Sequence, residues 1–159
     1  MIQIEEMSDD EIEDFLLQIG YGHLGCSNND QPYVLPIHYA YQKPYIYFYT
    51  TEGLKSEIIR SNALVCLQVE QVVDNADWRS VVVNGVAEQI TNISEREEAV
   101  NLILRTNPTL TPAISIRWMD EWIRENKEIV YRIKPTSATG RTPVKVSISA
   151  AAATPHRSK

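Results

Sequence analysis

The sequence has few of the residues from which metal sites and disulfides are built. Its two cysteines, Cys26 and Cys66, lie far apart without a C-x-x-C spacing, and each sits in an apolar run. Its three histidines, His23, His38 and His156, do not have metal-ligand spacing with a cysteine or with one another. We therefore predict no metal site, and we expect buried, reduced thiols rather than a disulfide.

An excess of basic charge and long apolar runs are also lacking. The 159-residue chain has 15 Lys and Arg against 21 Asp and Glu, and its net charge of −6 argues against a general nucleic-acid surface. No apolar stretch approaches the roughly 20 residues that a membrane-spanning helix needs. The acidic start, MIQIEEMSDDEIEDF, lacks the order of a signal peptide. We expect a cytoplasmic protein that binds neither nucleic acid nor membrane.

The motifs of two common catalytic sites are absent as well. The chain contains no G-x-S-x-G and no phosphate-binding G-x-x-x-x-G-K-[ST]. Serines, cysteines and carboxylates are present, but the sequence alone gives none of them a catalytic partner. Any redox chemistry must therefore come from a cofactor.

The composition is that of a globular domain with a polar end. Hydrophobic residues make up 43% of the chain and charged residues 23%, which allows a real core. A capping box, Ser8 with Glu11, predicts the start of a helix that Gly20 can end. We expect one domain over residues 1–142 and a disordered tail over 143–159, since PVKVSISAAAATPHRSK has no aromatic residue and ends polar.

Short aromatic and β-branched runs predict about six strands. They are GHLGCS, the two halves of YVLPIHYAYQKPYIYFYT, ALVCLQVEQV, WRSVVVNGVAEQI and EIVYRIK. Tight turns between neighbouring strands favour an antiparallel sheet, and six strands suggest closure into a small barrel. Flanking helices are predicted after the second capping box, Ser94 with Glu97, and around Trp118–Ile123. The fold class is therefore mainly β (α+β).

Two strand positions leave alternatives open. Pro36 cannot donate to a ladder, so its strand lies at an edge, is bulged, or has its backbone facing something else. Asn84-Gly85 is either a two-residue hairpin turn or a bend inside one long curved strand. We favour the bend, because the segment VAEQIT after it is short for a partner strand.

The stretch YIYFYTTEGLKSEIIRSN could hold an anion where its strand meets a short helix. Thr50 and Thr51 offer hydroxyl donors, the helix directs its positive end to the same place, and Lys55 adds a full charge. A phosphate monoester needs these three kinds of group. Glu52 would oppose a phosphate unless its side chain points to solvent. The simpler interpretation is an ordinary threonine N-cap beside a surface lysine.

The stretch WRSVVV leaves a similar choice. Arg79 and Ser80 at the head of a strand could bond a phosphate or a heterocycle, with Trp78 packed on it. The simpler interpretation is an aromatic residue at a strand end beside a solvated arginine. His38 points away from its apolar neighbours, so either a polar surface or a pocket would satisfy it.

Three segments in order resemble a known family. GYGHLGCSNNDQPYVLPIHYAY, YIYFYTTEGLKSEIIRSN and WRSVVVNGVAE resemble the pyridoxamine 5′-phosphate oxidase-like, FMN-binding split-barrel proteins, over roughly residues 5–135. Within this family, the segments resemble the small flavin-nucleotide-binding, nitroimidazole-resistance-like proteins. The resemblance implies a six-stranded antiparallel split β-barrel, and a homodimer with two FMN sites at the subunit interface.

The resemblance also implies which residues contact the cofactor FMN. The strand with Pro36, Ile37 and His38 would lie along the isoalloxazine and ribityl chain, with the backbone of the first two facing the ring. The phosphate would be held by Thr50, Thr51 and Lys55. The neighbouring strand, of the same or the partner subunit, would contribute Trp78, Arg79 and Ser80.

Two positions where this sequence departs from its relatives argue against two activities found in the family. Many nitroimidazole-resistance relatives carry a histidine at the position of Tyr49, so their nitro-reducing chemistry is in doubt here. The segment YRIKPTSATGR has no histidine of the kind that grips the substrate of vitamin B6 oxidases. We expect a flavin-dependent oxidoreductase that acts on a small-molecule substrate or electron acceptor. The alternatives are a non-catalytic flavin sensor or carrier, and a haem- or deazaflavin-binding split-barrel protein.

Overall fold

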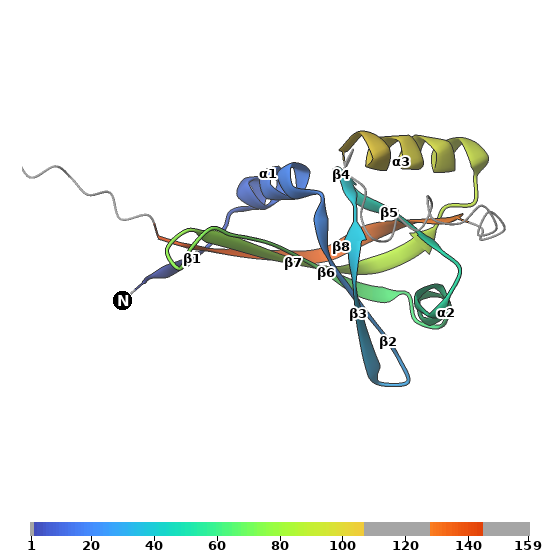
Figure 1. Ribbon diagram of the computed structural model, residues 1–159, viewed down its shortest axis with the longest axis horizontal. Coiled ribbons are helices and arrows are strands. Elements are labelled where there is room, and N and C mark those ends of the chain that lie inside the picture. Colours follow the sequence, from blue (N-terminus) through green and yellow to red (C-terminus); the bar gives the residue numbers. More distant parts are fainter. Residues whose placement is uncertain (1, 107–127, 145–159) are drawn as a thin grey trace, which may run out of the picture.

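The computed structural model describes residues 2–106 and 128–144 of the chain (Figure 1). In these residues three helices and eight strands follow one another: β1 (Ile4–Glu6), α1 (Asp9–Ile19), β2 (Tyr21–Asn28), β3 (Gln31–His38), β4 (Ala40–Gln42), β5 (Tyr45–Thr51), α2 (Leu54–Ser61), β6 (Leu64–Val72), β7 (Trp78–Gln89), α3 (Ile93–Thr106) and β8 (Glu128–Pro143). Among these helices, none is long and apolar enough to cross a membrane.

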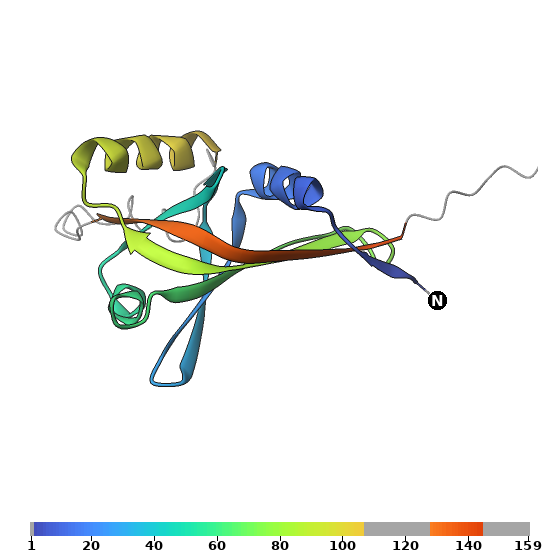
Figure 2. The same cartoon turned by 180° about the vertical axis from the view of Figure 1, so that it is seen from behind.

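The strands form one antiparallel sheet in the order β3-β2-β6-β7-β8-β5-β4, with β1 paired to β8. In Figures 1 and 2, α1 and α3 lie on one side of the long strands β7 and β8, and the β2–β3 hairpin projects from the other side. The sheet curls into a half-barrel with flanking helices, which confirms the predicted fold class. The described residues hold eight strands rather than six, because β1 is too short to leave a pattern and one predicted strand is divided into β3 and β4.

The division between β3 and β4 falls at Tyr39, which is fully buried. β3 ends at His38 on one edge of the sheet and β4 begins at Ala40 on the opposite edge, so the chain changes edges across one residue. The Tyr39 N–H donates to the carbonyl oxygen of Gly20 at 3.0 Å. Its hydroxyl donates to the carbonyl oxygen of Leu16, also at 3.0 Å. Tyr39 therefore attaches the crossing to the end of α1.

Helix α1 has both predicted ends. The backbone N–H of Glu11 donates to Ser8 Oγ at 3.3 Å, and the Ser8 N–H donates to Glu11 Oε2 at 2.7 Å. Gly20 closes the helix in the left-handed region, with φ 69°, where glycine has no Cβ to clash. The predicted capping box is confirmed.

Helix α3 begins differently from the prediction. Its cap is Asn92, whose side-chain oxygen accepts the N–H of Glu95 at 3.1 Å, so the capping box predicted at Ser94 and Glu97 is wrong. Asparagine is as good a cap as serine, and the chain uses the earlier position. The other predicted helix, around Trp118–Ile123, lies outside the described residues.

The hydrophobic core fills the curl of the sheet. The largest fully buried side chains among the described residues come from α1, α3, five strands and the junction of β3 and β4: Phe15, Leu24, Tyr39, Ile46, Phe48, Leu67, Val69, Val81, Val83, Ile103, Tyr131 and Ile133. Cys26 and Cys66 are free thiols, as predicted, but only Cys26 is buried and Cys66 is half-buried. In the β2–β6 pair Cys26 lies opposite Val65 and Cys66 opposite Gly25. The two thiols therefore project from opposite faces of the sheet.

Both open strand questions are decided by pairing. β7 is one strand with a register shift between Asn84 and Gly85, so the predicted bend is confirmed. A Cβ at Gly85 would lie 2.6 Å from the carbonyl oxygen of Lys134, which explains the glycine. Pro36 lies in β3, which is an edge strand of the sheet. An edge position is where a missing N–H is tolerated.

The last strand reaches the start of the predicted tail. Pro143 pairs with Ile4 of β1, and the Val144 N–H donates to the carbonyl oxygen of Gln3 at 2.8 Å. The rest of the predicted tail, residues 145–159, lies outside the described residues.

Replacing Tyr39 with phenylalanine should destabilise the fold. The change removes the buried hydroxyl that donates to the carbonyl oxygen of Leu16, so we expect the free energy of unfolding in urea to fall by about 1–2 kcal/mol. The matched control is Tyr33→Phe, since the hydroxyl of the half-buried Tyr33 makes no hydrogen bond among the described residues. Equal losses in the two variants would show that the crossing does not depend on this bond.

Candidate functional site

Neither of the two threonines at the junction of β5 and α2 is the N-cap residue of the helix. Side chains alternate along a strand, so Thr50 turns inward, with 7% of its surface exposed, while Thr51 is half-buried on the other side. The Thr50 hydroxyl makes only a long 3.4 Å contact with the carbonyl oxygen of Thr51. The N-cap of α2 is Gly53. The interpretation of this junction as an ordinary threonine N-cap is therefore wrong.

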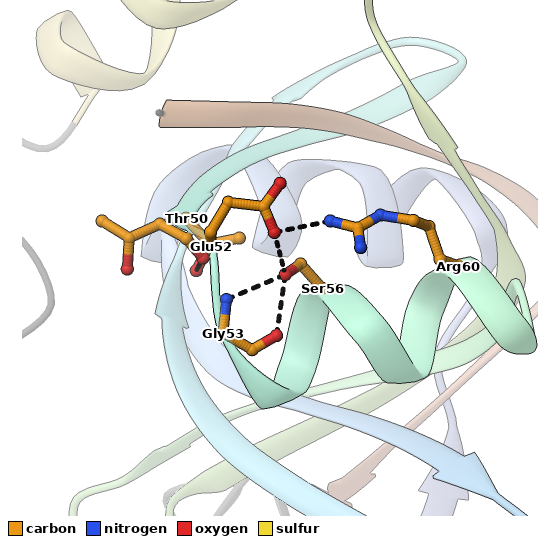
Figure 3. Close-up of polar contacts among 6 residues, drawn as sticks. Thr50, Glu52, Gly53, Ser56 and Arg60 are labelled. Atoms are coloured by element: carbon orange, nitrogen blue, oxygen red, sulfur yellow. Dashed lines mark hydrogen bonds and ion pairs between the residues drawn. The ribbon is translucent and has the colours of Figure 1, made fainter. Parts of the chain in front are cut away.

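Ser56, which the sequence reasoning missed, closes the first turn of α2. Its buried Oγ accepts the Gly53 N–H at 3.0 Å and lies 2.8 Å from the Gly53 carbonyl oxygen (Figure 3). A serine three residues after a glycine N-cap was the available signal. Because Ser56 occupies the Gly53 N–H, the N–H groups free to meet a ligand are the next ones in the turn.

Glu52 is held along the helix and away from the strand end. One of its carboxylate oxygens, Oε2, accepts hydrogen bonds from Ser56 Oγ at 3.0 Å and from the guanidinium of Arg60 (Figure 3). The side chains of Glu52 and Arg60 are 44% and 51% exposed. An anion at this junction requires Glu52 to point to solvent, and the exposed pairing of Glu52 with Arg60 meets this requirement.

Lys55 has no counter-ion in the part of the chain that the structure describes. It is half-buried in the first turn of α2, and burial lowers the pKa of its ammonium group. The adjacent Gly53 faces open space, since a Cβ built there would meet nothing within 4 Å. A desolvated cation beside an accessible backbone and a helix N-terminus would gain free energy from a bound anion.

The β3 residues of the predicted site lie on the strand that contacts β5. Pro36 is exposed, Ile37 is buried against the core, and His38 is half-buried. The His38 ring meets the ring of Tyr21 edge to face, with centroids 5.4 Å apart. The structure therefore brings the end of β3 close to the strand that carries Thr50 and Thr51.

The three predicted residues of β7 lie elsewhere. Trp78 opens β7 and pairs with Val72, whereas Val86 pairs with Leu64 just after α2. At about 3.3 Å per residue, Trp78 and Val86 are about 26 Å apart. Within one chain the structure does not bring Trp78, Arg79 and Ser80 to Lys55.

Arg79 already has contacts within its own chain. Its guanidinium lies over the ring of Phe15 at 4.7 Å and donates to Gln71 Oε1 at 2.7 Å and Gln18 Oε1 at 3.3 Å. These contacts tie α1 to strands β6 and β7. If Arg79 also binds a ligand, it must do so while keeping or giving up these contacts with Phe15, Gln71 and Gln18.

One glycine spacing in the chain looks like a nucleotide motif and is not one. Gly20, Gly22 and Gly25 have the spacing of G-x-G-x-x-G, but they lie at the end of α1 and within β2, and no helix follows them directly. A Cβ at Gly22 would lie 2.5 Å from the carbonyl oxygen of Gln68, and one at Gly25 would lie 2.7 Å from Cys66 Sγ. These two glycines therefore permit close strand packing. No group of three metal-ligating side chains occurs in residues 2–106 and 128–144 either.

The fold agrees with the family comparison. A family model described as pyridoxamine 5′-phosphate oxidase matches residues 8–142. The chain belongs to this family, and its resemblance to the pyridoxamine 5′-phosphate oxidase-like split-barrel proteins is confirmed.

Known proteins similar to the chain include the uncharacterized Rhizobium meliloti protein RA0666. It is 35% identical over 82 residues, which are 52% of this chain and 54% of that protein, so the match spans about half of the relative's length. The solved structure of an FAD-binding protein from Mesorhizobium loti, mll6688, is 26% identical, with a TM-score of 0.73 over 91% of this chain and 100% of the other. A candidate 5-nitroimidazole antibiotic resistance protein from Bacteroides thetaiotaomicron is 20% identical, with a TM-score of 0.68 over 89% and 88% of the two chains.

The pKa values of Lys55 and Lys43 should be shifted in opposite directions from the ordinary value of a lysine. Burial lowers the pKa of Lys55, whereas a hydrogen bond and ion pair with Glu13, at 2.6 Å, raise the pKa of the exposed Lys43. As the pH rises, Lys55 should therefore lose its charge before Lys43. NMR titration of the ¹³C-methylated lysines would measure both, and Lys55 titrating at or above Lys43 would contradict the assigned environment.

Proposed function

We propose that this protein binds FMN, with the phosphate at the junction of β5 and α2. The observation that carries the proposal is the half-buried Lys55, which has no counter-ion among the described residues. Thr50 and Thr51 end β5, and the first N–H groups of α2 follow a few residues later in the chain. Together they supply the hydroxyl, amide and ammonium donors that a phosphate monoester accepts.

The residues present fit a terminal phosphate. One lysine at one helix N-terminus suits a single dianionic group, whereas the diphosphate of FAD lies inside the molecule and has no monoester. The Mesorhizobium loti relative is named as FAD-binding, so both flavins belong in the test. The backbone of Pro36 and Ile37, on the edge strand β3, would orient the ring.

We assign the activity to the flavin-dependent oxidoreductases that act on a small molecule. A bound flavin supplies hydride or electron transfer, and the chain's own residues bind the phosphate, orient the ring and exclude water. The two free thiols suit a reducing compartment, so we place the protein in the cytoplasm. Anaerobic bleaching of the bound flavin by NADH or NADPH would distinguish an oxidoreductase from a sensor or carrier.

We further propose a homodimer in which each flavin contacts both chains. Trp78, Arg79 and Ser80 lie too far from Lys55 to share its ligand within one chain. Exposed apolar side chains occur along the sheet and its ends: Ile4, Tyr21, Val34, Leu64, Val72 and Val73. Two-fold pairing is the commonest way to cover such side chains, and it would bring the head of a partner's β7 to the flavin.

The purified protein should contain FMN. Cofactor released by heat should chromatograph with FMN and not with FAD or riboflavin, because the site is built for a terminal phosphate. Elution as FAD would contradict the choice of FMN alone. A colourless protein that leaves the fluorescence of added FMN and FAD unchanged would overturn the proposed function.

Replacing Lys55 with alanine should weaken FMN binding by roughly ten- to a hundredfold. The change removes one charge-assisted hydrogen bond to the phosphate, worth about 1.5–3 kcal/mol. Fluorescence titration of the apoprotein would measure the affinity. Lys43→Ala is the control, because Lys43 lies before the other end of β5 and pairs with Glu13. Equal losses in both variants would indicate a general effect of charge.

Dilution of the protein into monomers should release flavin. Each chain would keep only part of the contacts, so dissociation and flavin release should follow the same concentration dependence. Light scattering across a dilution series, with flavin fluorescence read in parallel, measures both. A monomer that keeps FMN at full occupancy would contradict the shared site and leave the phosphate assignment standing.

A further inference from the structure

We propose that Arg60 is a positioning residue that keeps Glu52 from competing with the phosphate for Lys55. This inference rests on the proposed function, because it concerns how the same site stays open to an anion. Nothing in the resemblance to known families assigns Arg60 or Glu52 a role.

Glu52 occupies the least favourable position for an acid near an anion site. It directly follows Thr50 and Thr51, lies just before the N-cap Gly53 and precedes Lys55 by three residues. An ionised carboxylate there could pair with Lys55 or repel a phosphate. The structure does not show the first arrangement, since Lys55 has no ion pair among the described residues.

Two side chains of α2 hold the Glu52 carboxylate in another direction. Ser56 Oγ lies 3.0 Å from Oε2, and the guanidinium of Arg60, in the last turn of the helix, binds the same oxygen (Figure 3). Arg60 thereby draws the carboxylate along the helix towards its C-terminal end. Arg60 also compensates the charge, because Glu52, Lys55 and Arg60 together carry one positive charge, whereas Glu52 and Lys55 alone would carry none.

The pair is too exposed to serve mainly as a source of stability. About half of each side chain lies in solvent, and exposed ion pairs contribute little to the free energy of folding. The charge of Arg60 should affect phosphate binding more strongly than folding, because the site is partly desolvated at Lys55. The expected effect of Arg60 is therefore on phosphate affinity and not on folding.

The test compares FMN with riboflavin, which lacks the phosphate, in fluorescence titrations of the full-length apoprotein at low ionic strength. Arg60→Gln should weaken FMN binding by about three- to tenfold, leave riboflavin binding unchanged and leave the midpoint of thermal unfolding nearly unchanged. The double variant with Glu52→Gln should recover FMN affinity to within about twofold of the original, since no competing carboxylate remains. Arg60→Lys should keep most of the affinity.

The matched control is the double variant of Arg60→Gln with Glu57→Gln. Glu57 is an exposed acid in the first turn of the same helix, so this control removes the same charge without removing the side chain that Arg60 holds. It should recover less affinity than the Glu52 double variant. Equal recovery would show that net charge alone matters and would overturn the inference.

Three other results would also overturn it. They are unchanged FMN affinity in Arg60→Gln, a loss that persists in the Glu52 double variant, and an equal loss for riboflavin. The second of these would mean that Arg60 acts on the phosphate directly. Failure of the original protein to bind FMN would instead overturn the proposed function, and this inference with it.

Discussion

The crossing at Tyr39 is the constraint on which the rest of the structure depends. Strands β3 and β4 follow one another in the chain but lie at opposite ends of the sheet, so the sheet must curl to bring its ends together. The buried Tyr39 holds this geometry with hydrogen bonds from its backbone to Gly20 and from its hydroxyl to Leu16. These bonds join the sheet's closure to α1, which packs over the same core.

The curl also decides where the candidate site lies. It brings β3 against β5, so the edge strand with Pro36 lies next to the strand that ends in Thr50 and Thr51. Helix α2 begins there, and burial leaves Lys55 desolvated without a counter-ion among the described residues. The site's charge balance then comes from one short helix, in which Ser56 and Arg60 bind the only acid of the junction itself, Glu52.

The length of the sheet explains why one chain is insufficient for the whole proposed site. The end of β7 that carries Trp78 lies beside β1 and the end of β8, far from α2 (Figure 1). Arg79 uses that position to bind Gln71 and to cover Phe15. Under the proposed function, a contact between these residues and the flavin would come from the partner subunit.

The sequence by itself determined the features that depend on neighbouring residues. They include the capping box of Ser8 and Glu11, the helix end at Gly20 and the segments that carry the family resemblance. Only the tertiary structure decided the separation of β3 from β4, the strand β1, and the pairing of Glu52 with Arg60, because each depends on partners that no local pattern specifies. At α3 the sequence contains two residues that could cap the helix, and in the folded structure Asn92 and not Ser94 is the cap. Hydrogen bonds between neighbouring residues can be predicted from residue spacing. Which strands lie at the edges of the sheet, and which way a charged side chain points, depend on how the sheet curls.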